Sequence, residues 1–126
     1  MVKAIQQIIL ELSQEEGFGT VVLTDPTGLP LAISENREEA EALAAVVADI
    51  LRSSAGIGRR LGWGDMSEIM LLSNDAQRGV LCRRFQAGEQ DLVLALFIQP
   101  QYVYWKATTQ AINKIKQAWH FSSKGK

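Results

Sequence analysis

A single cysteine, Cys82, and a single histidine, His120, occur in a chain of 126 residues. One cysteine cannot form a disulfide within the chain, and the two residues are too few for a zinc or iron-sulfur site. We therefore expect no metal, no cofactor and the reducing setting of the cytoplasm. Cys82 has apolar neighbours and is expected to pack as a small hydrophobic residue, whereas His120 is expected at the surface.

Neither sign of charge dominates, because 13 lysines and arginines nearly balance 14 aspartates and glutamates. This balance argues against nucleic acid or anionic lipid as a partner, since both attract a positively charged protein. The sequence also has no apolar run of the roughly 20 residues that span a bilayer, and its first residues do not have the pattern of a signal peptide. We expect a soluble protein with no membrane insertion.

Motifs for catalysis and nucleotide binding are missing as well. Gly56, Gly58 and Gly62 superficially resemble a phosphate-binding loop. They end a predicted helix, however, whereas such a loop follows a strand and opens a helix. Because no motif groups a nucleophile with a general acid or base, we predict no catalytic residue and no enzymatic activity.

The composition that remains is that of a globular protein, with 47% hydrophobic and 21% charged residues. A chain of this length fits one domain with one hydrophobic core. We expect a single domain over residues 1–121 and a loose tail over residues 122–126.

The first third of the chain predicts a helix and a β-hairpin. Apolar residues at helical spacing form a short amphipathic helix that ends at the glycines around Phe18. Residues 20–24 and 29–34 have strand composition and flank the turn Asp25-Pro26-Thr27-Gly28. Pro30 lacks an amide proton, which places the second strand at a sheet edge. The apolar positions of the helix are Ile5, Ile8, Ile9 and Leu12.

The rest of the chain predicts two further helices around three strands. Capping and acidic side chains start a long helix at about Asn36, which runs toward Leu61. Three strands follow, over residues 67–73, 79–85 and 91–98. A closing amphipathic helix is predicted from apolar spacing. Its core positions are Trp105, Thr108, Ile112, Ile115 and Trp119.

Residues 92–98 have no polar side chain, which is typical of a strand covered on both faces. We therefore place this strand at the centre of the sheet, with a helix layer on each face. The predicted fold is of the α+β type. It is a largely antiparallel sheet between helices, in the order α-β-β-α-β-β-β-α.

The element order, the segment Leu23-Thr24-Asp25-Pro26-Thr27-Gly28-Leu29-Pro30-Leu31 and the alanine-rich long helix together resemble the roadblock/dynein light chain family. The resemblance covers nearly the whole chain. It implies a roadblock/longin-like fold with a five-stranded sheet of order 2-1-5-4-3, dimerisation with itself or a relative, and adaptor or GTPase-regulating roles. The family has no catalytic triad or metal site to carry over. Similar bacterial and archaeal proteins often accompany Ras-like GTPases, so we expect such a GTPase as partner.

The long helix has more apolar surface than one sheet needs. At 100° per residue its apolar arc is about 200° wide, against the roughly 100° that covers a sheet. We expect one stripe to face the sheet and a flank of mostly alanines to contact a second subunit; the alternative is that alanine only favours the helix. The stripe consists of Leu43, Val46, Val47, Ile50, Ile57 and Leu61. The predicted interface consists of Ala44, Ala48, Leu51 and Ala55, together with Arg52.

The strand over residues 67–73 lies at the other edge in the implied order and has no proline. An apolar edge aggregates unless it is paired or covered. We expect Ile69 and Leu71 to meet the same edge of a second copy, with a covering loop as the alternative. Trp63 and one of Tyr102 and Tyr104 are candidate contact aromatics.

Arg83 and Arg84 are neighbours on one strand, so they are expected on opposite faces of the sheet, with one of them ion-paired beneath a helix. Together with the family resemblance, the sequence predicts a non-catalytic dimeric adaptor that binds a small Ras-like GTPase or another partner protein and modulates its nucleotide cycle or localisation. The alternative is a small-molecule-sensing regulatory domain, which lacks support because the central strand has no polar cluster.

Overall fold

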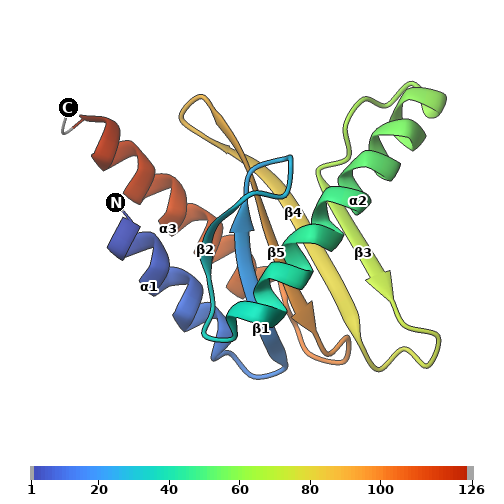
Figure 1. Ribbon diagram of the computed structural model, residues 1–126, viewed down its shortest axis with the longest axis horizontal. Coiled ribbons are helices and arrows are strands. Elements are labelled where there is room, and N and C mark those ends of the chain that lie inside the picture. The colour runs from blue at the N-terminus through green and yellow to red at the C-terminus, as the bar shows by residue number, and fades with distance from the viewer. Residues whose placement is uncertain (1, 125–126) are drawn as a thin grey trace.

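The computed structural model describes the backbone of residues 2–124 and the side chains of residues 2–120. The elements follow the predicted order (Figure 1). They are α1 (Val2–Ser13), β1 (Phe18–Thr24), β2 (Pro30–Ile33), α2 (Arg37–Leu61), β3 (Glu68–Leu72), β4 (Gly79–Ala87), β5 (Gln90–Ile98) and α3 (Trp105–Lys124). α3 continues past residue 121, where the sequence places the end of the domain. Residues 125–126 of the predicted tail lie outside the described residues.

The five strands form one antiparallel sheet of order β2-β1-β5-β4-β3, as the family resemblance implies. β5 lies at its centre, and residues 92–96 are completely buried. The prediction of a doubly covered central strand is therefore confirmed. Pro30 opens the edge strand β2, which confirms the assignment made from its missing amide proton.

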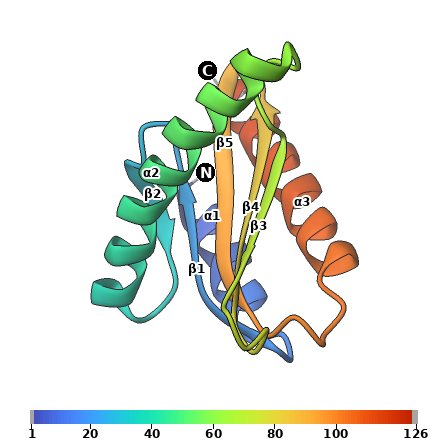
Figure 2. The ribbon, with the colours of Figure 1, turned by 90° about the vertical axis from the view of Figure 1, so that its right-hand side faces the viewer.

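Helices cover both faces of the sheet (Figure 2). α1 and α3 pack on one face, and α2 packs on the other. Alternate residues of β5 point into the two layers, because successive side chains of a strand face opposite sides. Leu94 and Leu96 join the layer under α1 and α3, and Val93 and Ala95 join the layer under α2.

Both ends of α2 are fixed by hydrogen bonds. The Asn36 side chain accepts a bond from the Glu39 amide, which caps the N-terminus. At the other end Gly62 has a φ of +70°, and its amide donates to the Arg59 carbonyl. The Trp63 amide donates to the Gly58 carbonyl, which completes a Schellman motif. These contacts account for the predicted bounds of the long helix.

The β1–β2 turn is held by the Asp25 carboxylate. Its Oδ1 accepts hydrogen bonds from the amides of Thr27 and Leu29, at 2.8 and 3.1 Å, and from the Thr27 hydroxyl at 2.6 Å. Gly28 has a φ of +89°, and a Cβ there would lie 2.8 Å from the Ala48 Cβ. Only glycine therefore lets this turn lie directly against α2.

Candidate dimer and partner interface

α2 packs on the sheet through a different part of its apolar arc from the one predicted. Val46, Ile57 and Leu61, which the sequence places toward the sheet, are 42%, 53% and 51% exposed. That part of the stripe prediction is wrong. Because the apolar arc is wider than the sheet requires, the sequence pattern alone does not determine how α2 is rotated about its axis. The close contact of α2 with the Gly28 turn determines this rotation. The apolar residues of α2 that are buried against the sheet are Ala40, Leu43, Ala44, Val47 and Leu51.

The predicted alanine flank therefore contributes to the packing within one chain. Ala44 and Leu51 are buried in the core, and Ala48 is half-buried against the hairpin turn. Ala55 is half-buried as well, and Arg52 is exposed, with its guanidinium bound to Asp49 on the same helix. This side of α2 leaves little apolar surface for another chain.

The opposite flank of α2 continues onto strands that the helix does not cover. α2 lies mainly against β1, β2 and β5. On the same face, Ile69 of β3 pairs with Cys82 of β4, and Leu71 pairs with Val80. Leu71 is 48% exposed. We call the apolar residues on this side of the molecule, taken together, the apolar seam. It consists of Val46, Ile50, Ile57, Leu61, Ile69, Leu71, Val80 and Phe97.

β3 forms one edge of the sheet, as predicted. It pairs with β4 on one side, and within the described residues no strand pairs with its other side. Trp63 lies just before this strand, at the end of α2, and is 71% exposed. The structure thus brings Ile69, Leu71 and Trp63 to one side of the molecule, away from the alanine flank.

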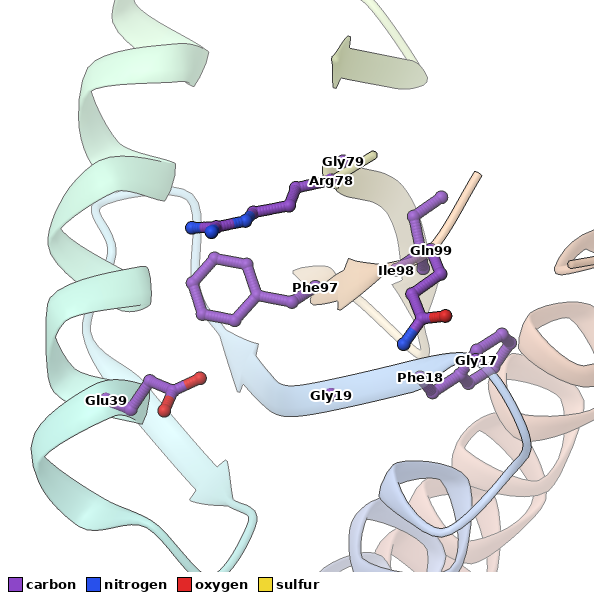
Figure 3. Close-up of a pocket in the computed structure, with 9 residues that line it drawn as sticks. All are labelled: Gly17, Phe18, Gly19, Glu39, Arg78, Gly79, Phe97, Ile98 and Gln99. Carbon is purple, nitrogen blue, oxygen red and sulfur yellow. The ribbon is translucent and has the colours of Figure 1, made fainter. Parts of the chain in front are cut away.

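A hollow of about 330 Å³ lies at the end of the sheet where β4 begins (Figure 3). The Phe97 ring forms its middle, with the Arg78 side chain on one side and the Glu39 carboxylate on the other. Glu39 also accepts a hydrogen bond from the Thr20 hydroxyl, which fixes its position. The complete lining is Gly17, Phe18, Gly19, Glu39, Arg78, Gly79, Phe97, Ile98 and Gln99.

Sequence reasoning missed this hollow because its lining comes from separate elements and turns of the fold. Gly79 is the one partial signal, since a glycine at the start of a strand often marks a close approach. A Cβ at Gly79 would lie 3.1 Å from both Ile98 Cγ1 and Leu72 Cδ2. The exposed seam residues Val46, Ile57 and Leu61, by contrast, are visible in the sequence as apolar residues of the helix.

Arg83 lies beneath α3, which confirms that one of the two arginines is ion-paired under a helix. Its guanidinium donates to the hydroxyls of Thr108 and Thr109, both at 2.8 Å, and lies 3.6 Å from the Glu68 carboxylate. The Trp105 ring stacks over it at 3.8 Å. Burial lowers the pKa of Arg83. Trp105 is 49% exposed, so its predicted place in the helix core is wrong.

Arg84 faces the other side of the sheet and binds Asp91 at 3.1 Å and Asp65 at 3.8 Å. Cys82 is buried in the layer under α2, and burial raises the pKa of its thiol to about 12. Cys82 is therefore a structural residue, as predicted. His120 is exposed.

The described part of the chain contains no group of three or more histidine, cysteine, aspartate or glutamate residues placed to hold a metal ion. Its helices include none that is both long and apolar enough to cross a membrane.

Comparison with known proteins gives one family and one fold. The sequence profile of the Roadblock/LC7 domain matches residues 4–80. No curated protein matches the chain.

Several solved structures have the same fold over nearly the whole chain. Myxococcus xanthus MglB superposes with a TM-score of 0.76 at 12% identity, over 94% of this chain and 90% of that one. A Roadblock/LC7 domain from Streptomyces avermitilis gives a TM-score of 0.74 at 16% identity, over 94% and 97% of the two chains. The gliding protein MglB of Thermus thermophilus gives 0.68 at 18% identity, over 94% and 87%.

Proposed function

Because the chain belongs to the Roadblock/LC7 domain family, we propose that it is a homodimeric adaptor for a small Ras-like GTPase. It modulates the nucleotide cycle or the localisation of that GTPase without catalytic residues of its own. The observation that carries the proposal is the apolar seam, which joins the free flank of α2 to the bare face of β3 and β4. A group of exposed and half-exposed apolar residues on one side of a protein is typical of a protein contact site.

The two-fold arrangement follows from the edge strand. When β3 pairs antiparallel with β3 of a second copy, the two sheets become one, and the unpaired backbone groups of both edges find partners. The same symmetry places the exposed flank of one α2 beside the other. The seam of one copy then packs against the seam of the other. This contact buries the exposed seam residues Val46, Ile57, Leu61 and Leu71.

Mutation of the seam tests the dimer. Val46→Glu places a charge in the seam, where it faces its own symmetry copy without water, and the protein should become monomeric. Ala45→Glu is the matched control, because Ala45 is the adjacent exposed residue on a different side of α2. Light scattering should give twice 13.9 kDa for the wild type and the control, and 13.9 kDa for Val46→Glu. A monomeric wild type would refute the dimer.

The GTPase partner is supported by the family resemblance. We expect the protein to change the rate of GTP hydrolysis or nucleotide release of a small Ras-like GTPase from the same organism. Calorimetry should detect the complex in one nucleotide state more strongly than in the other. If no such GTPase binds, the adaptor must serve another class of protein.

Small-molecule sensing, the alternative function, has less support. The β5 side chains that point into the two helix layers are all apolar, so the central strand offers no polar group to orient a metabolite.

A further inference from the structure

The tip of α2 carries an exposed tryptophan on a narrow turn. Trp63 is 71% exposed and lies between Gly62 and Gly64, which have φ values of +70° and +78°. A Cβ added at either glycine would have no neighbour within 4 Å, so the space next to both glycines is open. The end of α2 extends beyond the sheet in both views (Figures 1 and 2). A side chain with this much apolar area contributes strongly wherever a partner buries it.

The tip and the hollow lie at opposite ends of β3. Trp63 precedes Glu68, the first residue of β3. The hollow is lined by Gly79, which pairs with Leu72, the last residue of β3. α2 also crosses its sheet diagonally and ends at a corner beyond β3 (Figure 1), whereas Glu39 in its first turn lines the hollow.

Antiparallel pairing of β3 with its symmetry copy reverses the direction of the strand. The tip of one copy is thereby carried to the end of the sheet where the other copy has its hollow. We propose that Trp63 of each subunit inserts into the hollow beside Phe97 of the other, so that two reciprocal insertions secure the dimer. This inference rests on the proposed homodimer and identifies the residues that decide its affinity.

The chemistry of the hollow suits an indole side chain. Its volume of about 330 Å³ is at the lower end of ligand pockets, which fits one large aromatic group. The Phe97 ring provides an apolar wall, and the Glu39 carboxylate provides an acceptor for the indole N–H. The hollow is flanked by both signs of charge, Arg78 and Glu39, so only its Glu39 side attracts Arg59 and Arg60, which precede the tip.

A pair of tryptophan variants tests the insertion. Trp63→Ala should raise the dimer dissociation constant about thirtyfold or more, because a buried tryptophan is a typical hot spot. Trp105→Ala removes the same side chain from the opposite face of the sheet, and it should leave the dissociation constant within about threefold, since rim and remote residues contribute little. Sedimentation over a dilution series measures both. An unchanged constant for Trp63→Ala in a dimeric wild type would overturn the insertion and leave the dimer itself intact.

Disulfide trapping gives an independent readout. Trp63→Cys combined with Arg78→Cys should form a covalent dimer on mild oxidation, whereas each single variant and the pair Trp63→Cys with Leu29→Cys should not. The native Cys82 is buried and does not compete. Failure of the first pair to cross-link at concentrations where the protein is dimeric would place the tip elsewhere. A wild type that is monomeric at all concentrations would instead refute the homodimer.

Discussion

The Asp25 carboxylate shows how one side chain can organise a turn. Burial alone would raise its pKa, but the hydrogen bonds from Thr27, Leu29 and Gly28 together outweigh burial and lower the pKa below the ordinary value of 3.8. A lowered pKa in the folded state means that the carboxylate stabilises the fold above pH 3.8. That contribution is lost as the pH falls through the lower, folded value.

We predict that Asp25→Ala lowers the free energy of unfolding by about 1–2 kcal/mol at pH 7, since amide donors in the turn lose their acceptor. The difference from wild type should shrink as the pH falls below about 4, because the protonated carboxyl accepts hydrogen bonds less well. Urea unfolding at pH 7 and pH 2.5 measures both effects. Asp25→Asn keeps one acceptor oxygen and should lose less. A difference that stays constant down to pH 2.5 would contradict this account.

Cys82 is the other residue whose environment changes its chemistry. With a pKa of about 12 instead of 9.0, its thiolate is about a thousandfold rarer near neutral pH than that of an ordinary cysteine. We predict that a disulfide reagent such as DTNB reacts with the native protein at least about tenfold more slowly than with the urea-unfolded chain, because the thiolate is rarer and the side chain is buried. Rapid labelling of the native protein would show that β4 is less well covered than the structure indicates.

Two glycines near the end of α2 differ in how much space surrounds them, and this difference is visible only in the structure. A Cβ at Gly56 would meet one atom, the Arg59 Nη2 at 3.8 Å, whereas a Cβ at Gly58 would lie 1.8 Å from the Gly64 carbonyl oxygen. We predict that Gly56→Ala stabilises the protein by about 0.5–1 kcal/mol, as alanine usually does within a helix. Gly58→Ala should destabilise it by about 1–3 kcal/mol through overpacking. Urea unfolding of both variants measures the contrast, and equal effects would contradict it.

At the level of elements, local signals in the sequence were sufficient to predict the helices, strands and turns. The turn at Asp25, the cap at Asn36 and the apolar run of β5 each depend on neighbouring residues, and each was confirmed. The strand order came from the family resemblance. The rotation of α2 could not be predicted, because both flanks of the helix are apolar and the choice depends on the distant Gly28. Trp105 was misplaced for a similar reason, since it packs on Arg83 from another element.

For the molecule as a whole, the proposed self-association implies that stability depends on concentration. A dimer that unfolds to two chains gains about 1.4 kcal/mol for each tenfold rise in protein concentration. We predict that the Tm of the wild type rises by about 3–5 °C per tenfold increase, whereas the Tm of Val46→Glu stays constant. Calorimetric scans between about 5 and 500 µM provide the measurement. A wild-type Tm that does not respond to concentration would show that the seam is not closed by a second copy.

The edge strand β2 determines where sheet growth stops. In the proposed dimer the two β3 edges pair with each other, so the described strands leave two copies of β2 as free edges, and β2 is four residues long and opens with Pro30. Without the amide proton of proline, such an edge is a poor template for a further strand. The proposed assembly is therefore finite, because the β3 edge of each chain pairs with a second copy and the β2 edge does not accept a further strand. Sheet pairing then produces a particle of fixed size instead of a fibre.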